Sequence, residues 1–427
     1  MSVEGGLLGG ATGGATGGAT GGATGGATGG ATGGATVNAL GDGFATPLIC
    51  DAMVRQRAAC IDPADEIRWS LPDRNDPANH SHITRWEPWV RSYLCAQSLV
   101  SNLRFHVYRA GAQRASRGDP GDPDNEGSLP AWQAEGFSVT LTARLNRQRS
   151  RSGRRVRLAT LVRPTDEAFQ AQVDRVLEWA DLREERMPEV LAQIGNTYAF
   201  WGTIIPVHAD RLRNTREILD AAVQFATFVE MRFKHELACW RPFDLSPQVQ
   251  PMITTPGHGS LPSGHCVESY VIKEVLQLLL GVSRTNPEHE TLRRQFSRTA
   301  ARIATNRVVA GVHFPIDNLA GRLLGKVLGR YFAFCCGVEK APSTKGGPAD
   351  PEAMWHAGAF VGPRCVDGIE FDPETQAIFE PDTRPDYYHY DAPTELKLLR
   401  PADNLLKPIW QAAQKELELL QLCFKSE

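Results

Sequence analysis

Apolar residues recur every three or four positions through almost the whole of residues 165–336. This spacing is typical of amphipathic helices, because it places the apolar side chains on one helix face. The run DEAFQAQVDRVLEWADLREERMPEVLAQI is one example, and the segments around His265, Arg302 and Leu323 repeat the pattern. The pattern therefore predicts an all-α fold, in which the helices of residues 161–340 pack as a bundle.

Residues 37–160 show a more mixed pattern than the bundle. The run WEPWVRSYLCAQSLVSNLRFHVYRA has helical periodicity, whereas FSVTLTARL alternates as a short strand does. Between these two runs, the Pro, Gly and Asp residues near 118–130 predict a loop. The arginine-rich run RLNRQRSRSGRR at 144–155 predicts a second, solvated loop, with binding of an anion or a partner as the less favoured alternative. We therefore expect a mixed, mostly helical N-terminal segment.

The two ends of the chain differ from the bundle in composition. Residues 1–36 carry GGAT repeats, which lack the apolar surface to offset their ordering entropy, so we expect a disordered tail. Residues 341–427 begin with a stretch rich in Pro, Gly, Asp and aromatic residues, 341–392, which predicts an extended segment lying over the bundle. The final run, LLKPIWQAAQKELELLQLCF, predicts an amphipathic helix whose apolar face would also suit a dimer interface.

Composition narrows the class of protein. The chain has 427 residues, of which 42% are hydrophobic and 22% charged, so it can bury a large core. Its net charge of −3 gives no reason to expect nucleic acid as a partner. A run of roughly twenty uncharged apolar residues is absent, so we expect no membrane partner. The nine scattered cysteines and the lack of a signal-peptide pattern favour a cytoplasmic location.

Two basic residues, Lys234 and Arg241, lie seven positions apart in the run KHELACWRP. On one helix, residues seven apart fall on nearly the same face, so the two charges would point at one anion. Pro242 would then end that helix. This segment predicts one wall of an anion-binding site.

A second segment, GSLPSGHCVESYVIKEVLQLLL, has the features of a helix start. Pro262 and small residues precede an apolar run of helical periodicity. A helix N-terminus carries free N–H donors and a positive dipole end, so the amides near Ser263 and Gly264 would face the same anion, as would the Ser263 hydroxyl. His265 would stand beside the anion and exchange a proton near neutral pH.

The third segment, NRVVAGVHFPIDNLAGR, places His313 between Gly311 and Pro315, at a turn into another helix. Asp317 follows one helical turn later, where its carboxylate can accept the Nδ1 proton of His313 and leave Nε2 free as a nucleophile or metal ligand. Arg307 adds a guanidinium group for the oxygens of the anion. Together, the three segments predict one pocket for a tetrahedral oxyanion.

In this order, the three segments resemble the shared signature of the vanadium-dependent haloperoxidases and of the type 2 phosphatidic acid phosphatase and bacterial acid phosphatase superfamily. That signature reads K-x6-RP, then PSGH, then SR-x5-H-x3-D. Asn306 stands where the family usually has Ser, and its amide can still donate and accept hydrogen bonds. The match runs from Lys234 to Asp317. It implies a helical bundle of the vanadium haloperoxidase and acid phosphatase type.

The resemblance implies one of two reactions at this pocket. In a phosphatase, His313 would attack phosphorus to form a phosphohistidine, while His265 protonates the leaving oxygen. In a haloperoxidase, His313 would instead hold vanadate, the expected cofactor, and Lys234 would polarise hydrogen peroxide for attack by halide. In both, the oxyanion would be held by Lys234, Arg241, Ser263, Gly264, Arg307 and His313.

His258, seven positions before His265, favours the haloperoxidase. Vanadium bromoperoxidases and iodoperoxidases resemble this sequence in carrying a His there, whereas the fungal chloroperoxidase has an aromatic residue and the small bacterial acid phosphatases lack the His. A loop His that faces water is the alternative interpretation. We therefore predict a vanadate-dependent enzyme that oxidises bromide or iodide with hydrogen peroxide. A soluble acid phosphatase and a non-catalytic helical scaffold are the alternatives, and a small organic substrate and a homo-oligomer are further expectations.

Overall fold

The computed structural model describes most of the chain between residues 86 and 338, together with the C-terminal helix. The described ranges are 86–109, 136–147, 150–195, 197–208, 210–283, 286–338 and 405–422, with short pieces at 51–52, 54–56, 60, 83, 358–360, 388–390 and 399–400. Three predictions lie outside the described residues, either wholly or for the most part. They concern the tail at 1–36, the loop at 118–130 and the extended segment at 341–392.

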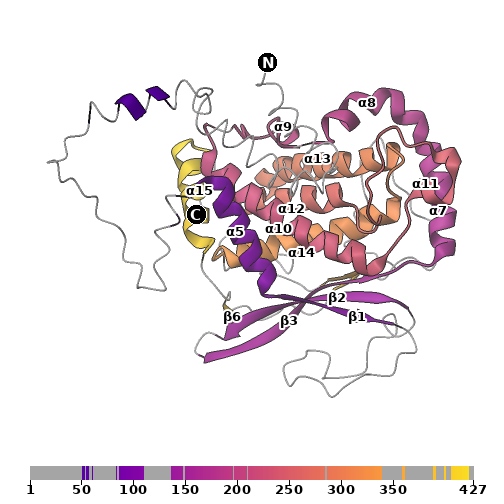
Figure 1. Cartoon of the computed structure of the whole chain (residues 1–427), viewed down its shortest axis with the longest axis horizontal. Coiled ribbons are helices and arrows are strands. Elements are labelled where there is room, and N and C mark those ends of the chain that lie inside the picture. The colour runs from indigo at the N-terminus through magenta and orange to yellow at the C-terminus, as the bar shows by residue number, and fades with distance from the viewer. Residues whose placement is uncertain are drawn as a thin grey trace.

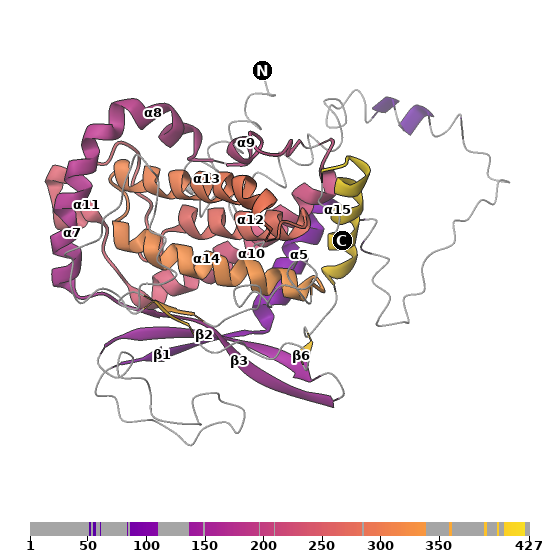
Figure 2. The same ribbon diagram turned by 180° about the vertical axis from the view of Figure 1, so that it is seen from behind.

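Four long helices form the centre of the molecule. They are α10 (Arg213–Leu237), α12 (Gly264–Leu279), α13 (Glu290–Val309) and α14 (Pro315–Cys335). α12 packs against the other three, and Figure 2 shows it between α13 and α14. Every residue of α12 except Leu278 is buried, as expected for a helix covered on all sides. The helical bundle predicted for this region is confirmed.

Shorter helices cover the bundle. α5 (Pro88–Ser101) and α15 (Lys407–Leu419) both pack against α10, and the apolar face of α15 is buried there through Trp410 and Leu417. The predicted C-terminal helix is thus confirmed, and its apolar face is used within the chain. The remaining helical pieces are α7 (Asp166–Glu178), η4 (Trp179–Leu182), α8 (Arg183–Ala192), α9 (Tyr198–Trp201), α11 (Pro242–Leu245), η5 (Pro247–Val249) and η6 (Pro287–His289).

A β-sheet lies along one side of the bundle (Figure 1). Its three long strands, all antiparallel, are β1 (Leu103–Tyr108), β2 (Ser138–Arg147) and β3 (Ser150–Val162). The short strands β4 (Gly358–Phe360), β5 (Tyr388–Tyr390) and β6 (Leu399–Arg400) extend it. Buried strand residues such as Leu141 and Leu161 join the same hydrophobic core as the helices. The fold is therefore mostly helical with a sheet layer, and the prediction of an all-α fold is wrong in this respect.

Local pattern predicts only one of the three long strands. FSVTLTARL lies largely within β2, as expected. The run LRFHVY, predicted to continue a helix, forms β1 instead, paired with β2 from Leu103↔Ala143 to Tyr108↔Ser138. The prediction of a loop at 144–155 is wrong for the residues that the structure describes, because 144–147 and 150–155 form the paired ends of β2 and β3. In both corrections, a partner strand supplies the backbone hydrogen bonds, and a segment's own pattern does not reveal that partner.

Candidate active site

Lys234 and Arg241 reach the site from different local structures. α10 ends at Leu237, and Ala238 takes a left-handed conformation with φ 48°, its N–H donating to the Lys234 carbonyl at 3.1 Å. Arg241 lies beyond the helix, and Pro242 is the first residue of α11, a position that suits proline. The prediction that the two side chains share one helix face is therefore wrong.

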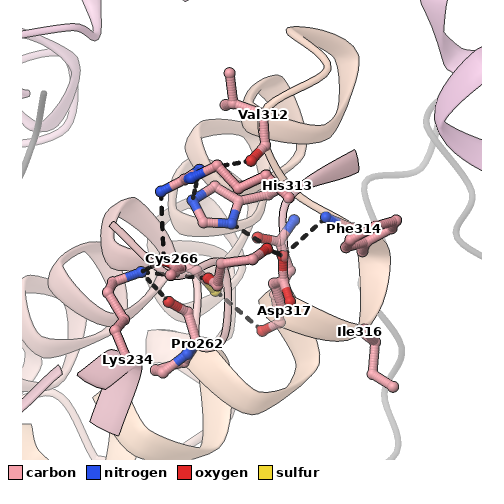
Figure 3. Close-up of polar contacts among 12 residues, drawn as sticks. Lys234, Pro262, Cys266, Val312, His313, Phe314, Ile316 and Asp317 are labelled. Atoms are coloured by element: carbon pink, nitrogen blue, oxygen red, sulfur yellow. Dashed lines mark hydrogen bonds and ion pairs between the residues drawn. The ribbon is translucent and has the colours of Figure 1, made fainter. Parts of the chain in front are cut away.

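The buried ammonium group of Lys234 ties α10 to the loop before α12. Its Nζ donates to the backbone carbonyls of Pro262, Ser260 (3.3 Å) and Gly259 (3.5 Å), and Figure 3 shows the Lys234–Pro262 contact. Arg241 Nη2 donates to the same Gly259 carbonyl at 3.4 Å. The reversal of the chain after α10 thus brings both cations to one loop.

α12 begins at Gly264 with Ser263 as its N-cap residue, as the sequence predicts. The Ser263 N–H donates to the Asp317 carbonyl at 3.0 Å, which joins the starts of α12 and α14. The Ser263 hydroxyl is buried and has no hydrogen-bond partner among the described residues. A Cβ on Gly264 would lie 2.5 Å from Glu230 Oε1, so a glycine allows α10 and α12 to approach closely here.

His313 lies in the turn between α13 and α14, four residues before Asp317 (Figure 3). Its Nδ1 is 3.0 Å from Asp317 Oδ2. Because an ionised carboxylate only accepts, Nδ1 carries the proton and Nε2 presents a lone pair. Oδ2 also accepts from the Phe314 N–H at 2.9 Å and from the Ser260 hydroxyl. These bonds fix the orientation of the imidazole ring.

Arg241 lies between two imidazoles. Its Nη1 donates to the Val312 carbonyl at 2.6 Å and is 3.4 Å from His313 Nε2. Its Nε donates to the His258 carbonyl at 2.9 Å, and its Nη2 is 3.2 Å from His258 Nδ1. His258 is half-buried. The structure therefore places His258 beside the other site residues and not in an exposed loop.

His265 and Arg307 both contact Gln193, which follows α8. His265 Nε2 donates to the Gln193 carbonyl at 2.7 Å. Since a carbonyl only accepts, the ring proton is on Nε2, and Nδ1 is left as an acceptor. Arg307 Nη2 donates to Gln193 Oε1 at 3.1 Å and to the Val190 carbonyl at 3.0 Å. Arg307 Nε is buried and has no partner in the described part of the chain.

The sequence of this region matches a known family. The family model of the PAP2 superfamily matches residues 218–337, a range that contains all three of the predicted segments. Residues 218–337 are thus similar to the PAP2 superfamily. Members of this superfamily are phosphatases or haloperoxidases.

Among solved structures, the chain is similar to a transmembrane PAP2-type phosphatidylglycerolphosphate phosphatase from Bacillus subtilis. The identity is 18% over 40% of this chain and 86% of that chain, with a TM-score of 0.32. A comparison with proteins of curated function finds no match. Within the ranges that the structure describes, no helix combines the length and the apolar character needed to cross a bilayer.

Burial lowers the pKa of each of the three basic groups, Lys234, Arg241 and Arg307. The pKa of Lys234 falls to about 8, that of Arg307 to about 9 and that of Arg241 to about 10. Desolvation is the main cause in each case, and the charge of Glu230 opposes it at Lys234. Cations held in a low-dielectric interior attract an anion strongly, so the site is suited to anionic ligands.

The imidazoles of the site are neutral at physiological pH. Burial, with the nearby charges of Lys234 and Arg241, lowers the pKa of His258 to about 3. Burial likewise lowers the pKa of His265 and of His313 well below the usual range. Each ring is therefore neutral, with a lone pair on Nε2 of His313 and on Nδ1 of His265.

Some hydrogen-bond donors of the site remain without a partner among the described residues. The Ser263 hydroxyl and Arg307 Nε are buried without a partner among the described residues. The first N–H groups of α12 have no acceptor within their own helix. In the described ranges, no group of three or more His, Cys, Asp or Glu side chains is placed to hold a metal ion by itself. The chemistry of these donors is that of an anion site and not of a metal-ion site.

Three residues of the site are not predicted by the sequence: Ser260, Gln193 and Glu230. The first two bond residues of the predicted segments, as described above, whereas the Glu230 carboxylate is buried against Gly264 with no hydrogen-bond partner among the described residues. Burial raises the pKa of Glu230 to about 7, against the charge of Lys234. Helical spacing could have indicated Glu230, because it lies one turn before Lys234. No local signal indicates the other two.

Proposed function

We propose that the protein is a vanadate-dependent haloperoxidase, which uses hydrogen peroxide to oxidise bromide or iodide to hypohalous acid. The observation that supports this proposal most is the position of His258. Its ring is half-buried, and its Nδ1 lies 3.2 Å from Arg241 Nη2. A neutral imidazole there gives the oxyanion site a polar wall that can hydrogen-bond to a peroxide oxygen.

Residues of the three predicted segments would hold vanadate. His313 Nε2, left with a lone pair by the Nδ1 bond to Asp317, would bind vanadium. Bound vanadate would supply a Lewis-acid centre that activates hydrogen peroxide toward halide. The vanadate oxygens would be contacted by Arg307, the Ser263 hydroxyl and the Gly264 N–H, and the positive charges of Lys234 and Arg241 would stabilise the bound anion.

His265 would exchange protons with the peroxide, and Lys234 would polarise it. His265 Nδ1 is an acceptor, because Nε2 donates to the Gln193 carbonyl, so it can take a proton from incoming hydrogen peroxide. The Lys234 ammonium, whose N–H groups donate to the Gly259, Ser260 and Pro262 carbonyls, would act on the peroxide through its positive charge and draw electron density out of the O–O bond. Overall, hydrogen peroxide, halide and one proton give hypohalous acid and water. His265 can therefore return its proton to the departing oxygen.

A phosphoester hydrolase is the second candidate, and the geometry of His313 favours it. A neutral His313 Nε2 could attack phosphorus and form a P–N bond as the P–O bond to the alcohol breaks. Lys234, Arg241 and Arg307 would hold the phosphoryl oxygens. His265 would have to be protonated before it could supply a proton to the leaving oxygen, and burial with the charge of Arg307 disfavours that form by lowering its pKa. We place the haloperoxidase first because of the half-buried position of His258 beside Arg241.

Bromide oxidation by the purified protein, with and without orthovanadate, tests the proposal. We expect little activity in vanadate-free protein with peroxide and bromide, and activity that rises with added orthovanadate. Inorganic phosphate should oppose this rise, because both anions are tetrahedral and would contact Lys234, Arg241 and Arg307. Non-competitive behaviour of the two anions would contradict a shared site. Hydrolysis of a phosphate monoester without vanadate-dependent bromination would replace the haloperoxidase with the phosphatase.

His258→Phe is expected to change the ratio of halide oxidation rates by about tenfold, with vanadate affinity nearly unchanged. The substitution removes a polar group beside Arg241 but none of the groups that would contact vanadate. The wild type should oxidise bromide and iodide much faster than chloride, because they are easier to oxidise. Steady-state rates at saturating peroxide measure both effects. His235→Phe, which alters an exposed ring on α10, is the control. Unchanged ratios in His258→Phe would remove His258 from halide selection.

A further inference from the structure

Gln193 joins two parts of the site through different atoms. The residue is fully buried at the end of α8. Its carbonyl accepts from His265 Nε2 at 2.7 Å, whereas its Oε1 accepts from Arg307 Nη2 at 3.1 Å and from Asn306 Nδ2 at 3.0 Å. Because Oε1 faces two groups that donate, the hydrogen bonds determine which way the amide is turned.

The amide of Gln193 leaves the charge of Arg307 intact. Arg307 Nη2 donates to two neutral oxygens, Gln193 Oε1 and the Val190 carbonyl. Burial is the cause that lowers the pKa of Arg307 to about 9, and the group remains a cation at neutral pH. A carboxylate in place of the amide would pair with the guanidinium and cancel the charge that an oxyanion requires.

Asn306 extends the same arrangement toward α8, which lies beside α13 in Figure 1. Its Nδ2 donates both to Gln193 Oε1 at 3.0 Å and to Glu189 Oε2 at 2.9 Å. Glu189 is already paired with Arg302, through contacts of 2.5 and 2.8 Å. The two amides thus separate the Glu189–Arg302 ion pair from Arg307. Asn306 is the position that departs from the family signature, and its amide links Gln193 to the Glu189–Arg302 ion pair.

We propose that Gln193 is a positioning residue of the oxyanion site. Its Oε1 holds Arg307 with the positive charge intact, and its carbonyl holds His265 in the tautomer whose Nδ1 accepts a proton. This inference rests on the oxyanion site of the proposed function and applies to vanadate and to phosphate alike. The two contacts are separable, because a substitution at position 193 removes Oε1 but keeps the backbone carbonyl.

Gln193→Glu tests the inference through binding of inorganic phosphate and orthovanadate to the full chain, measured by calorimetry across a pH series. Where the introduced carboxyl is ionised, it should pair with Arg307, and we expect affinities about 10- to 100-fold below those of the wild type. At lower pH the carboxyl is neutral and again acts as an acceptor, so the ratio of variant to wild-type affinity should return toward one. A merely structural defect would not be reversed by acid.

Gln193→Met provides the second variant, because it keeps the length and neutrality of the side chain but removes the acceptor. It should weaken binding by about tenfold at every pH, and it carries the test if Gln193→Glu does not fold. Gln170→Glu adds the same charge to an exposed position of α7 and should leave affinity unchanged. Thermal unfolding checks that each variant is folded.

The outcomes separate this inference from the proposed function. If the wild type binds phosphate and both Gln193 variants bind it equally well, the inference is overturned while the oxyanion site stands. If the wild type binds neither phosphate nor orthovanadate, the site and the inference are both overturned. Phosphate binding that responds to Gln193→Glu, without vanadate-dependent bromination, supports the inference and removes only the haloperoxidase.

Discussion

Replacing His313 with alanine is expected to abolish tight vanadate binding and turnover together, with a rate loss on the order of a thousandfold or more. His313 Nε2 is the atom that would bind vanadium or attack phosphorus, and Asp317 holds the ring so that this atom faces Arg241. Lys234, Arg241 and Arg307 would still attract an oxyanion in the variant. Weak, purely electrostatic binding of phosphate should therefore survive while vanadate-dependent activity disappears.

His289→Ala is the matched control for this experiment. His289 is also buried, and its Nδ1 accepts from the Ser283 N–H at 2.8 Å, in the loop after the C-terminal end of α12. Its loss should lower stability without removing the dependence on vanadate, because the oxyanion site lies at the opposite end of α12. Bromide oxidation and phosphatase rates are measured for both variants after circular dichroism shows that they are folded. A folded His313→Ala protein with most of the wild-type rate would contradict the assignment of the whole site.

Gly325→Ala is expected to destabilise the protein by about 2–3 kcal/mol. A Cβ at this position would lie 2.5 Å from the Val267 carbonyl oxygen and 2.7 Å from Tyr270 Cβ. These atoms belong to α12 and cannot move away as the end of a flexible side chain could, so α12 and α14 would have to separate. Alanine by itself favours a helix over glycine by about 1 kcal/mol. A net loss of stability would therefore show that the close contact between the helices costs more free energy than the helix propensity of alanine supplies.

Urea unfolding measures the free energy of unfolding of Gly325→Ala against that of Gly195→Ala. A Cβ on Gly195 would meet no atom within 4 Å, so this control should change stability by about 0.5 kcal/mol at most. Vanadate affinity should fall only in Gly325→Ala, because the Ser263 N–H bond to the Asp317 carbonyl crosses the same pair of helices. Equal or greater stability of Gly325→Ala would show that the two helices are not packed as closely as the structure has them.

Features that depend on neighbours within one helical turn follow from the sequence alone. The start of α12 at Gly264 is predictable, because Pro262 and Ser263 favour that end of a helix. The contact of His313 with Asp317 is predictable for the same reason, since it spans four residues. The C-terminal helix and β2 likewise carry complete periodicities. In each case the stabilising interactions lie within the segment that carries the pattern.

Features that depend on distant partners required the tertiary structure. The run LRFHVY forms β1 and not a helix because β2 pairs with it, and the arginine-rich run at 144–155 forms strands because its two halves pair with each other. The end of α10 is a similar case. Helical spacing would carry the helix on to Arg241, but the chain turns at Ala238, and Lys234 and Arg241 then bond the loop that leads to α12.

The oxyanion site also combines features that the sequence predicts with features that only the tertiary structure shows. Its charged and imidazole groups are predicted from the sequence, because Lys, Arg and His at these spacings are suited to one anion. The surroundings that tune them are set by packing: His265 meets Gln193 across 72 residues of chain, and Ser260 meets Asp317 across 57. No local pattern encodes which residues meet over such separations. The sequence therefore determined which groups would bind an anion, and only the packing of α8, α12 and α14 decided their tautomers, hydrogen-bond partners and burial.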